Sequence, residues 1–141
     1  MKILKYTFNI PQLVVEDGEL VEMGATEETY TFTLLFKGID LFEKIYNKPL
    51  LTELAKLSNV NEGNVANSLD VEMLKALAKA SYCKIDGNAF HQNMITAEEF
   101  SKTSAFTRIS MDTDFMIALL NMAVECCVNN QKVTGHTSTK K

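Results

Sequence analysis

The stretch FMIALLNMAVECCV, from Phe115 to Val128, is the part of the sequence that decides the fold. Its composition predicts a helix whose only polar side chains are Asn121 and Glu125, four residues apart and therefore on one face. An ordinary surface helix has an apolar stripe somewhat wider than about 100°, whereas this one is apolar over most of its circumference. Because a small domain offers few neighbours to cover such a helix, we expect part of it to contact another protein chain.

Three apolar rows run along this predicted helix. They hold, in order, Phe115, Leu119, Met122 and Cys126; then Met116, Leu120, Ala123 and Cys127; then Ile117, Val124 and Val128. The second row competes with the first for burial, and Met116 suits a core or an interface equally well because methionine adapts to irregular neighbours. The second row is therefore the predicted partner-binding surface, and its partner is a client protein or a second copy of the chain.

The composition limits the class of protein. The chain has 141 residues, 46% of them apolar and 23% charged, which is typical of one globular domain. Its net charge of −4 and scattered basic residues disfavour nucleic-acid binding. There is no secretory signal and no apolar run of the roughly 20 residues that a membrane span needs. The odd set Cys83, Cys126 and Cys127 indicates a reducing cytoplasm and three small buried residues rather than a disulfide framework.

The first forty residues have the period of half-buried strands. Strand patterns cover Leu4 to Ile10, a hairpin from Leu13 to Val21 around Asp17-Gly18, and Tyr30 to Phe36. Asp-Gly suits the positive φ angles of a tight hairpin turn. Pro11 is expected to end or deflect the first strand, and residues 24–26 to break the chain again.

From Gly38 onward the pattern is helical. The first predicted helix runs from a cap at Asp40 to Tyr46, and the second begins at Pro49 and carries Leu50, Leu51, Leu54 and Leu57. The third is capped by Ser68 or Asp70 and ends near Tyr82. A short helix with a Thr96/Glu99 capping box follows, and the Phe115–Val128 helix comes last. Residues 58–69 and 84–95 are predicted loops. The fold class is α+β, with a small antiparallel sheet in the N-terminal third and four or five helices after it. Residues 1–128 form a single domain, and 129–141 a polar, flexible tail.

No motif for catalysis, a cofactor or a metal is visible. His91 and His136 have no Cys, Asp or Glu at ligand spacing, and both are interpreted as solvated. The acidic residues around Asp17 lack the alternating pattern of a calcium loop and are interpreted as a solvated turn. We therefore expect no enzyme, no cofactor and no metal, and an interaction module instead.

The chain resembles the tail assembly chaperones of long-tailed bacteriophages that infect Gram-positive bacteria. The resemblance lies in the segment YTFTLLFKGIDLFEKIYNKPLLTELAKL, from Tyr30 to Leu57, where an aromatic strand passes through Lys-Gly into an acidic-aromatic helix and then a leucine helix. The size, the acidity, the helical second half and the polar C-terminus also match this family.

The resemblance implies a definite role. Such proteins bind the tape-measure protein in the host cytoplasm and keep it soluble until tail-tube subunits displace them, so they are absent from the mature virion. The family often makes a longer product by frameshifting, with which Lys140-Lys141 is compatible, although two solubilising lysines explain that pair equally well. The alternative interpretation is a structural tail or head–tail connector component that stays in the virion, where the β-rich first third would form rings by edge pairing.

Overall fold

A computed structural model describes residues 2–56 and 70–139, with side chains described through Val128. It confirms the α+β class, with six α-helices and a four-stranded antiparallel sheet among the described residues. The elements are β1 (Leu4–Glu16), β2 (Glu19–Phe32), α1 (Phe36–Tyr46), α2 (Leu50–Lys56), α4 (Val71–Ser81), β3 (Tyr82–Asp86), β4 (Ala89–His91), α5 (Met94–Ser101), α6 (Ser104–Thr107), a 3-10 helix (Ile109–Met111) and α7 (Thr113–Thr139).

The N-terminal hairpin is longer and more continuous than predicted. The turn at Asp17-Gly18 is confirmed, and both residues have the positive φ angles of a tight hairpin turn, 51° and 80°. Pro11 does not end β1, and residues 24–26 do not interrupt β2. The pairing register shifts between Pro11 and Leu13, so a local bulge absorbs the irregularity while both strands continue.

The change from strand to helix comes earlier than the sequence suggested. β2 ends at Phe32, and α1 begins at Phe36 instead of after a cap at Asp40. Gly38 was expected to end the sheet region. It lies instead within the first turn of α1, where it is buried and continues the helix. The alternation through Phe36 was misleading because Phe36 is exposed at the start of a helix rather than packed on the sheet.

Residues 84–95 were predicted as a loop, and this was wrong. They contain β4, most of β3 and the start of α5, with a turn around Gly87. The polar residues that suggested a loop occupy this turn and the cap of α5. The capping box uses Asn93 and Thr96 rather than Thr96 and Glu99, so α5 starts three residues earlier than expected.

The central helices follow the predicted pattern more closely. α2 begins directly after Pro49, and Asp70 caps α4 by accepting hydrogen bonds from the backbone N–H groups of Glu72 and Met73. The predicted loop at 58–69, Ser68 and Leu57 lie outside the described residues. α6 and the 3-10 helix before α7 were not anticipated.

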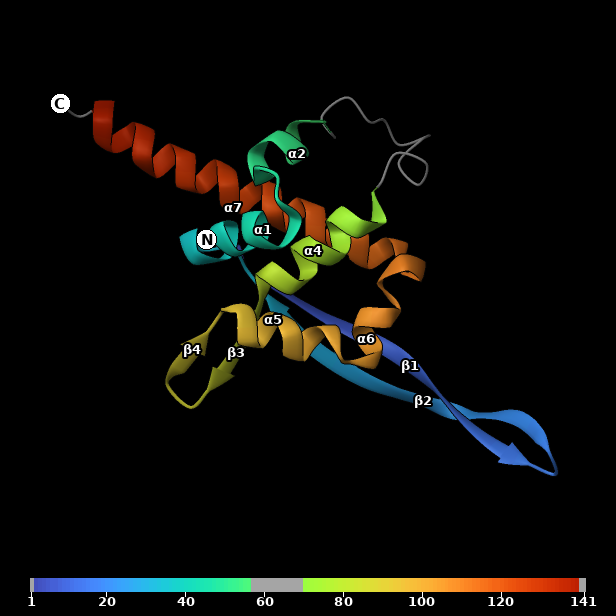
Figure 1. The fold of residues 1–141 in the computed structure, drawn as a ribbon. Helices are drawn as coiled ribbons and strands as arrows, with labels where there is room; N and C mark the ends of the chain where they lie inside the picture. The colour runs from blue at the N-terminus through green and yellow to red at the C-terminus, as the bar shows by residue number, and fades with distance from the viewer. Residues whose placement is uncertain (1, 57–69, 140–141) are drawn as a thin grey trace.

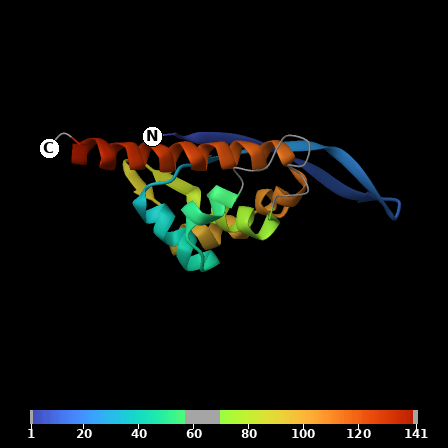
Figure 2. The same cartoon turned by 90° about the horizontal axis from the view of Figure 1, so that it is seen from above.

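The core lies between the base of the hairpin, α7 and the remaining helices. α4 is central, with contacts to α1, α5 and α7. Figure 2 shows α7 and the hairpin along one side of the molecule, with α1, α2, α4 and α5 on the other. The outer half of the hairpin and the C-terminal turns of α7 extend beyond the body at opposite ends (Figures 1 and 2).

The last helix continues past its predicted end at Val128. Its backbone is helical through Thr139, and no proline interrupts it after Val128. The division of the chain at residue 128 and the flexibility of the last residues stay predictions.

Candidate protein-interaction surface

The burial of α7 divides its three apolar rows between core and surface. The first row, from Phe115 to Cys126, is buried throughout. Phe115 packs against Phe8 and Phe32 of the hairpin, with ring centroids 4.9 and 5.2 Å apart, and against Tyr6 at 5.0 Å. These contacts orient the helix, because aromatic rings in such arrangements stabilise each other beyond simple burial.

The row predicted to bind a partner is part of the core. Met116, Ala123 and Cys127 are buried, and Leu120 is partly buried against the same core. They are covered by the chain's own residues because the hairpin base and the helices on the other side together cover a wider arc of α7 than the sequence suggested. Met116, for which core and interface were equally favoured, is a core residue. The partner surface of α7 must therefore be sought elsewhere.

The third row is the most exposed of the three apolar rows between Phe115 and Val128. Ile117, Val124 and Val128 are 41%, 44% and 43% exposed. They lie beside Asn121 and Glu125, which are also exposed and form the polar face predicted from the sequence. The accessible side of α7 is thus a narrow apolar strip bordered by a polar one, the pattern of a helix that packs weakly against another helix.

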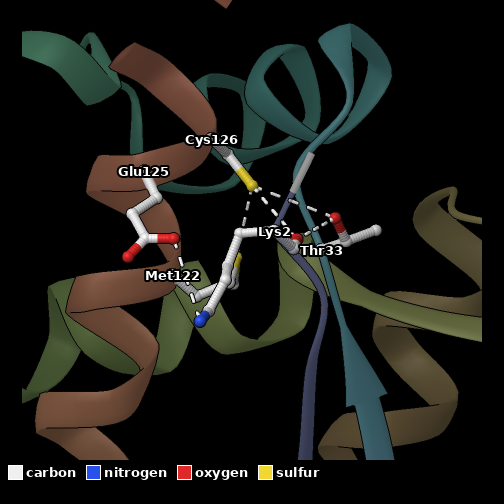
Figure 3. A network of polar contacts seen from close by, with 5 residues as sticks. All are labelled: Lys2, Thr33, Met122, Glu125 and Cys126. Carbon is white, nitrogen blue, oxygen red and sulfur yellow. Dashed lines mark hydrogen bonds and ion pairs between the residues drawn. The ribbon is translucent and has the colours of Figure 1, made fainter. Parts of the chain in front are cut away.

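A network of polar contacts fixes this orientation of α7 (Figure 3). The backbone oxygen of Lys2 accepts hydrogen bonds from the Thr33 hydroxyl at 2.7 Å and the Cys126 thiol at 3.4 Å, and the Lys2 ammonium lies 3.8 Å from the Glu125 carboxylate. The first residues of the chain and the end of β2 are thereby tied to α7. Rotation of the helix would break these contacts, so the third row is held away from the core.

The cysteines and histidines do not form a reactive centre among the described residues. All three cysteines are free and buried, as predicted. Burial raises the pKa of the Cys83 and Cys127 thiols to about 11, so these thiols stay protonated and weakly nucleophilic. His91 is half-buried in β4, and the side chain of His136 lies outside the described part. In residues 2–56 and 70–128, no three His, Cys, Asp or Glu side chains gather as a metal site would require.

The outer half of the hairpin is a second apolar surface, which was not predicted from the sequence. Leu13, Val15 and Leu20 are largely exposed there. The signal was present in the sequence, because Leu13-Val14-Val15 places apolar side chains on both faces of a strand, whereas a half-buried strand alternates. The pattern predicts an ordinary hairpin next to a solvated acidic turn, and it does not indicate that the side chains of this hairpin lie uncovered.

Comparisons with known proteins give no relative from which a function could be transferred. No family model matches the chain, and searches of curated proteins and of solved structures found no significant match. Within the described residues, none of the helices combines the length and apolar character needed to cross a membrane.

Proposed function

We propose that this chain is a tail assembly chaperone of a long-tailed bacteriophage. In this role it binds the tape-measure protein in the host cytoplasm, keeps it soluble and performs no catalysis. The proposal starts from the resemblance of the Tyr30–Leu57 segment to that family. Its client would be a long, amphipathic helical chain, which aggregates unless its apolar face is covered.

The observation that supports the proposal best is the accessible third row of α7. Ile117, Val124 and Val128 stay exposed, whereas the other two apolar rows between Phe115 and Val128 are buried or partly buried. Such a row suits a second amphipathic helix that lies along α7 and contacts it through apolar residues spaced three, four and seven positions apart. Because the strip is narrow, we expect a modest affinity for the client. A modest affinity suits a chaperone that tail-tube subunits must displace.

Co-expression with a tape-measure fragment tests the proposal. The wild-type chain should keep the fragment soluble and elute with it in size-exclusion chromatography. Ile117→Ser combined with Val124→Ser should weaken the complex about tenfold, since two apolar contacts are lost. The control, Asn121→Ser, changes the neighbouring polar strip without removing the Lys2–Glu125 ion pair and should leave binding unchanged. Insolubility of the fragment with the wild-type chain, or equal binding by both variants, would contradict the proposal.

The alternative, a structural tail or head–tail connector component, makes a different prediction. A chaperone is displaced during assembly and should be absent from purified particles, whereas a connector should be present in fixed stoichiometry. Mass spectrometry of purified virions separates the two. A stoichiometric amount of the chain in the particles would favour the connector.

A further inference from the structure

The outer end of the N-terminal hairpin projects as a two-stranded ribbon away from the body (Figure 1). We call residues 13–23 the arm tip. Leu13, Val15 and Leu20 are 60%, 70% and 72% exposed, so the body does not cover their side chains. A hairpin that stands alone is at best marginally stable in water, and it gains stability when a neighbour covers it. The arm tip therefore has the properties of a docking element rather than of a loop.

The arm tip is apolar on both faces. Leu13 pairs with Glu22 and Val15 with Leu20, so Leu13, Val15 and Leu20 share one face. Val14 pairs with Val21 on the opposite face. A ribbon that rested flat on a surface would need only one apolar face. Two apolar faces indicate that the tip inserts into its partner, with side chains covered from both sides.

Acidic residues are concentrated in the hairpin that carries the arm tip. Residues 6–36 contain six Asp or Glu and no Lys or Arg, whereas the rest of the chain has fourteen basic and twelve acidic residues. Four of the six acidic residues are Glu16, Asp17, Glu19 and Glu22 of the arm tip, and Glu16 pairs directly with Glu19 across the hairpin. Like charges in such a pair repel each other, so a basic partner would relieve a strain that the free arm carries.

The edges of the ribbon are poorly suited to pairing with another strand. Pro11 lacks an N–H donor, and the register shift beside it makes the two strands irregular. Proline, bulges and charged residues are the usual features that prevent edge-to-edge association. The side chains of the two faces, and not the backbone edges, are therefore the contact groups.

We propose that the arm tip docks into an apolar surface flanked by Lys and Arg side chains on a partner protein. Its apolar faces provide the contact area, and its carboxylates select a basic rim. A second copy of this chain fits less well, because the net charge is −4 and two acidic arms would repel each other. The inference does not rest on the role as a tail chaperone, since a different element carries it.

A peptide pair of opposite charge tests this inference with the full chain. The probes are two amphipathic helical peptides of equal length and equal leucine pattern, one with lysine and one with glutamate on the polar face. Fluorescence anisotropy should show that the wild-type chain binds the lysine peptide at least about tenfold more tightly than the glutamate peptide. Added salt should weaken this binding.

Three variants separate apolar docking from simple charge attraction. Leu13→Ser, Val15→Ser and Leu20→Ser together keep every charge and should lower the affinity for the lysine peptide about tenfold. Glu16→Gln, Glu19→Gln and Glu22→Gln together should weaken binding and flatten its salt dependence. Ile85→Ser with Phe90→Ser, an exposed apolar pair on β3 and β4, is the matched control and should bind like the wild type.

Several outcomes would overturn the inference. Unchanged binding by the serine triple variant would mean that charge alone attracts the peptide. Equal or absent binding of the two peptides by the wild-type chain would remove the preference for a basic partner. Concentration-dependent self-association that the serine variant abolishes would identify a second copy as the occupant. Far-UV circular dichroism and urea unfolding of each variant should match the wild type, since the changed side chains are exposed.

Discussion

The two halves of the N-terminal hairpin share a pair of strands but have opposite environments. At the base, Tyr6 and Phe8 point into a cluster with Phe115, and Tyr30 and Phe32 contact Phe100. At the arm tip, equally apolar side chains remain in solvent. The comparison teaches that apolar residues in a strand indicate burial only where another element lies opposite them. At the base that element is α7 or α5, and at the tip we infer that it is another protein.

The largest effect on stability should come from comparing a buried with an exposed apolar side chain at two adjacent residues of α7. Met116→Glu buries a charge without a partner, so we expect loss of cooperative folding, a cost of about 4 kcal/mol or more. Ile117→Glu, one residue further on, should change the free energy of unfolding by no more than about 0.5 kcal/mol because the side chain is exposed. Circular dichroism and urea unfolding measure both. A folded Met116→Glu variant would show that the second row is not core.

On the hairpin itself, the base and the tip should differ by several kcal/mol. Phe8→Ala removes a fully buried ring from the aromatic cluster and should lower the free energy of unfolding by about 3–5 kcal/mol. Val15→Thr keeps the β-branched shape at the tip and should change the free energy of unfolding by less than about 0.5 kcal/mol. If urea unfolding showed similar losses of stability for Phe8→Ala and Val15→Thr, the tip would be covered in solution and the contrast between the two halves would be wrong.

Gly38 tests how the base is attached to the helices. A Cβ there would lie 2.7 Å from Oε1 of Gln92, whose amide group donates to the backbone oxygens of Thr33 and Ser81 at 2.7 and 3.0 Å. Those two bonds prevent the side chain from moving freely. Gly38→Ala should therefore destabilise the protein by about 1–2 kcal/mol, despite the better helix propensity of alanine.

A double-mutant cycle isolates the Gly38 contact. In a Gln92→Ala background only the 3.1 Å approach to Leu34 Cδ2 remains, so the added methyl group should destabilise the protein less than it does in the wild type. Thermal unfolding of the four proteins gives the coupling energy. Equal effects of Gly38→Ala in both backgrounds would rule out Gln92 as the cause.

A smaller effect is expected at the hydrogen bond between the base and the start of α7. The Tyr6 hydroxyl donates to both carboxylate oxygens of Asp112, at 2.8 and 3.0 Å, and Asp112 also accepts from the backbone N–H of Phe115. Tyr6→Phe should cost about 1 kcal/mol at neutral pH. Burial, followed by the hydrogen bond to Asp112, raises the pKa of Tyr6 from 10.0 to about 12.

This shift also predicts a pH dependence. The contribution of Tyr6 to stability is present in full below pH 10 and is lost as the pH rises toward 12, because the folded state holds the proton more tightly than the unfolded state. Urea unfolding across this range should show a shallower decline for Tyr6→Phe than for the wild type. Identical slopes would mean that the hydroxyl is not hydrogen-bonded to Asp112 in solution.

The smallest global effect should come from the turn. Gly18 has a φ angle of 80°, which a residue with a Cβ adopts at a cost. Because the turn lies far from the core, Gly18→Ala should leave global stability within about 0.5 kcal/mol but speed amide exchange in the arm tip. Hydrogen exchange followed by NMR measures this locally. Faster exchange at the base as well would mean that the two halves unfold together.

Local signals accounted for much of the fold. The Asp17-Gly18 turn depends on backbone preferences and was predicted correctly, and Asp70 was one of the two residues predicted to cap α4. The strand at Tyr82–Asp86 was missed because a short strand with one core-facing residue has no clear period. Gly38 was misread because glycine usually interrupts elements, whereas here the close approach of Gln92 requires it within a helix.

The candidate surface was harder to predict than the fold. Three apolar rows on the last helix can be read from the sequence, which offers no means of ranking them by burial. Met116 and Ile117 are adjacent, similarly apolar and only about 100° apart around the axis. Which of them faced solvent depended on how the hairpin base and α4 approach the helix, and those contacts join residues far apart in the chain.

By itself, the sequence determined the α+β class, the Asp17-Gly18 turn, the polar face of α7 and the concentration of acidic residues in the hairpin, because these follow from composition and short-range spacing. Only the tertiary structure decided that the Met116 row is core, that the Ile117 row is accessible and that the arm tip stands clear of the body. The physical reason is that burial is a property of pairs of surfaces, and a local pattern describes only one of them.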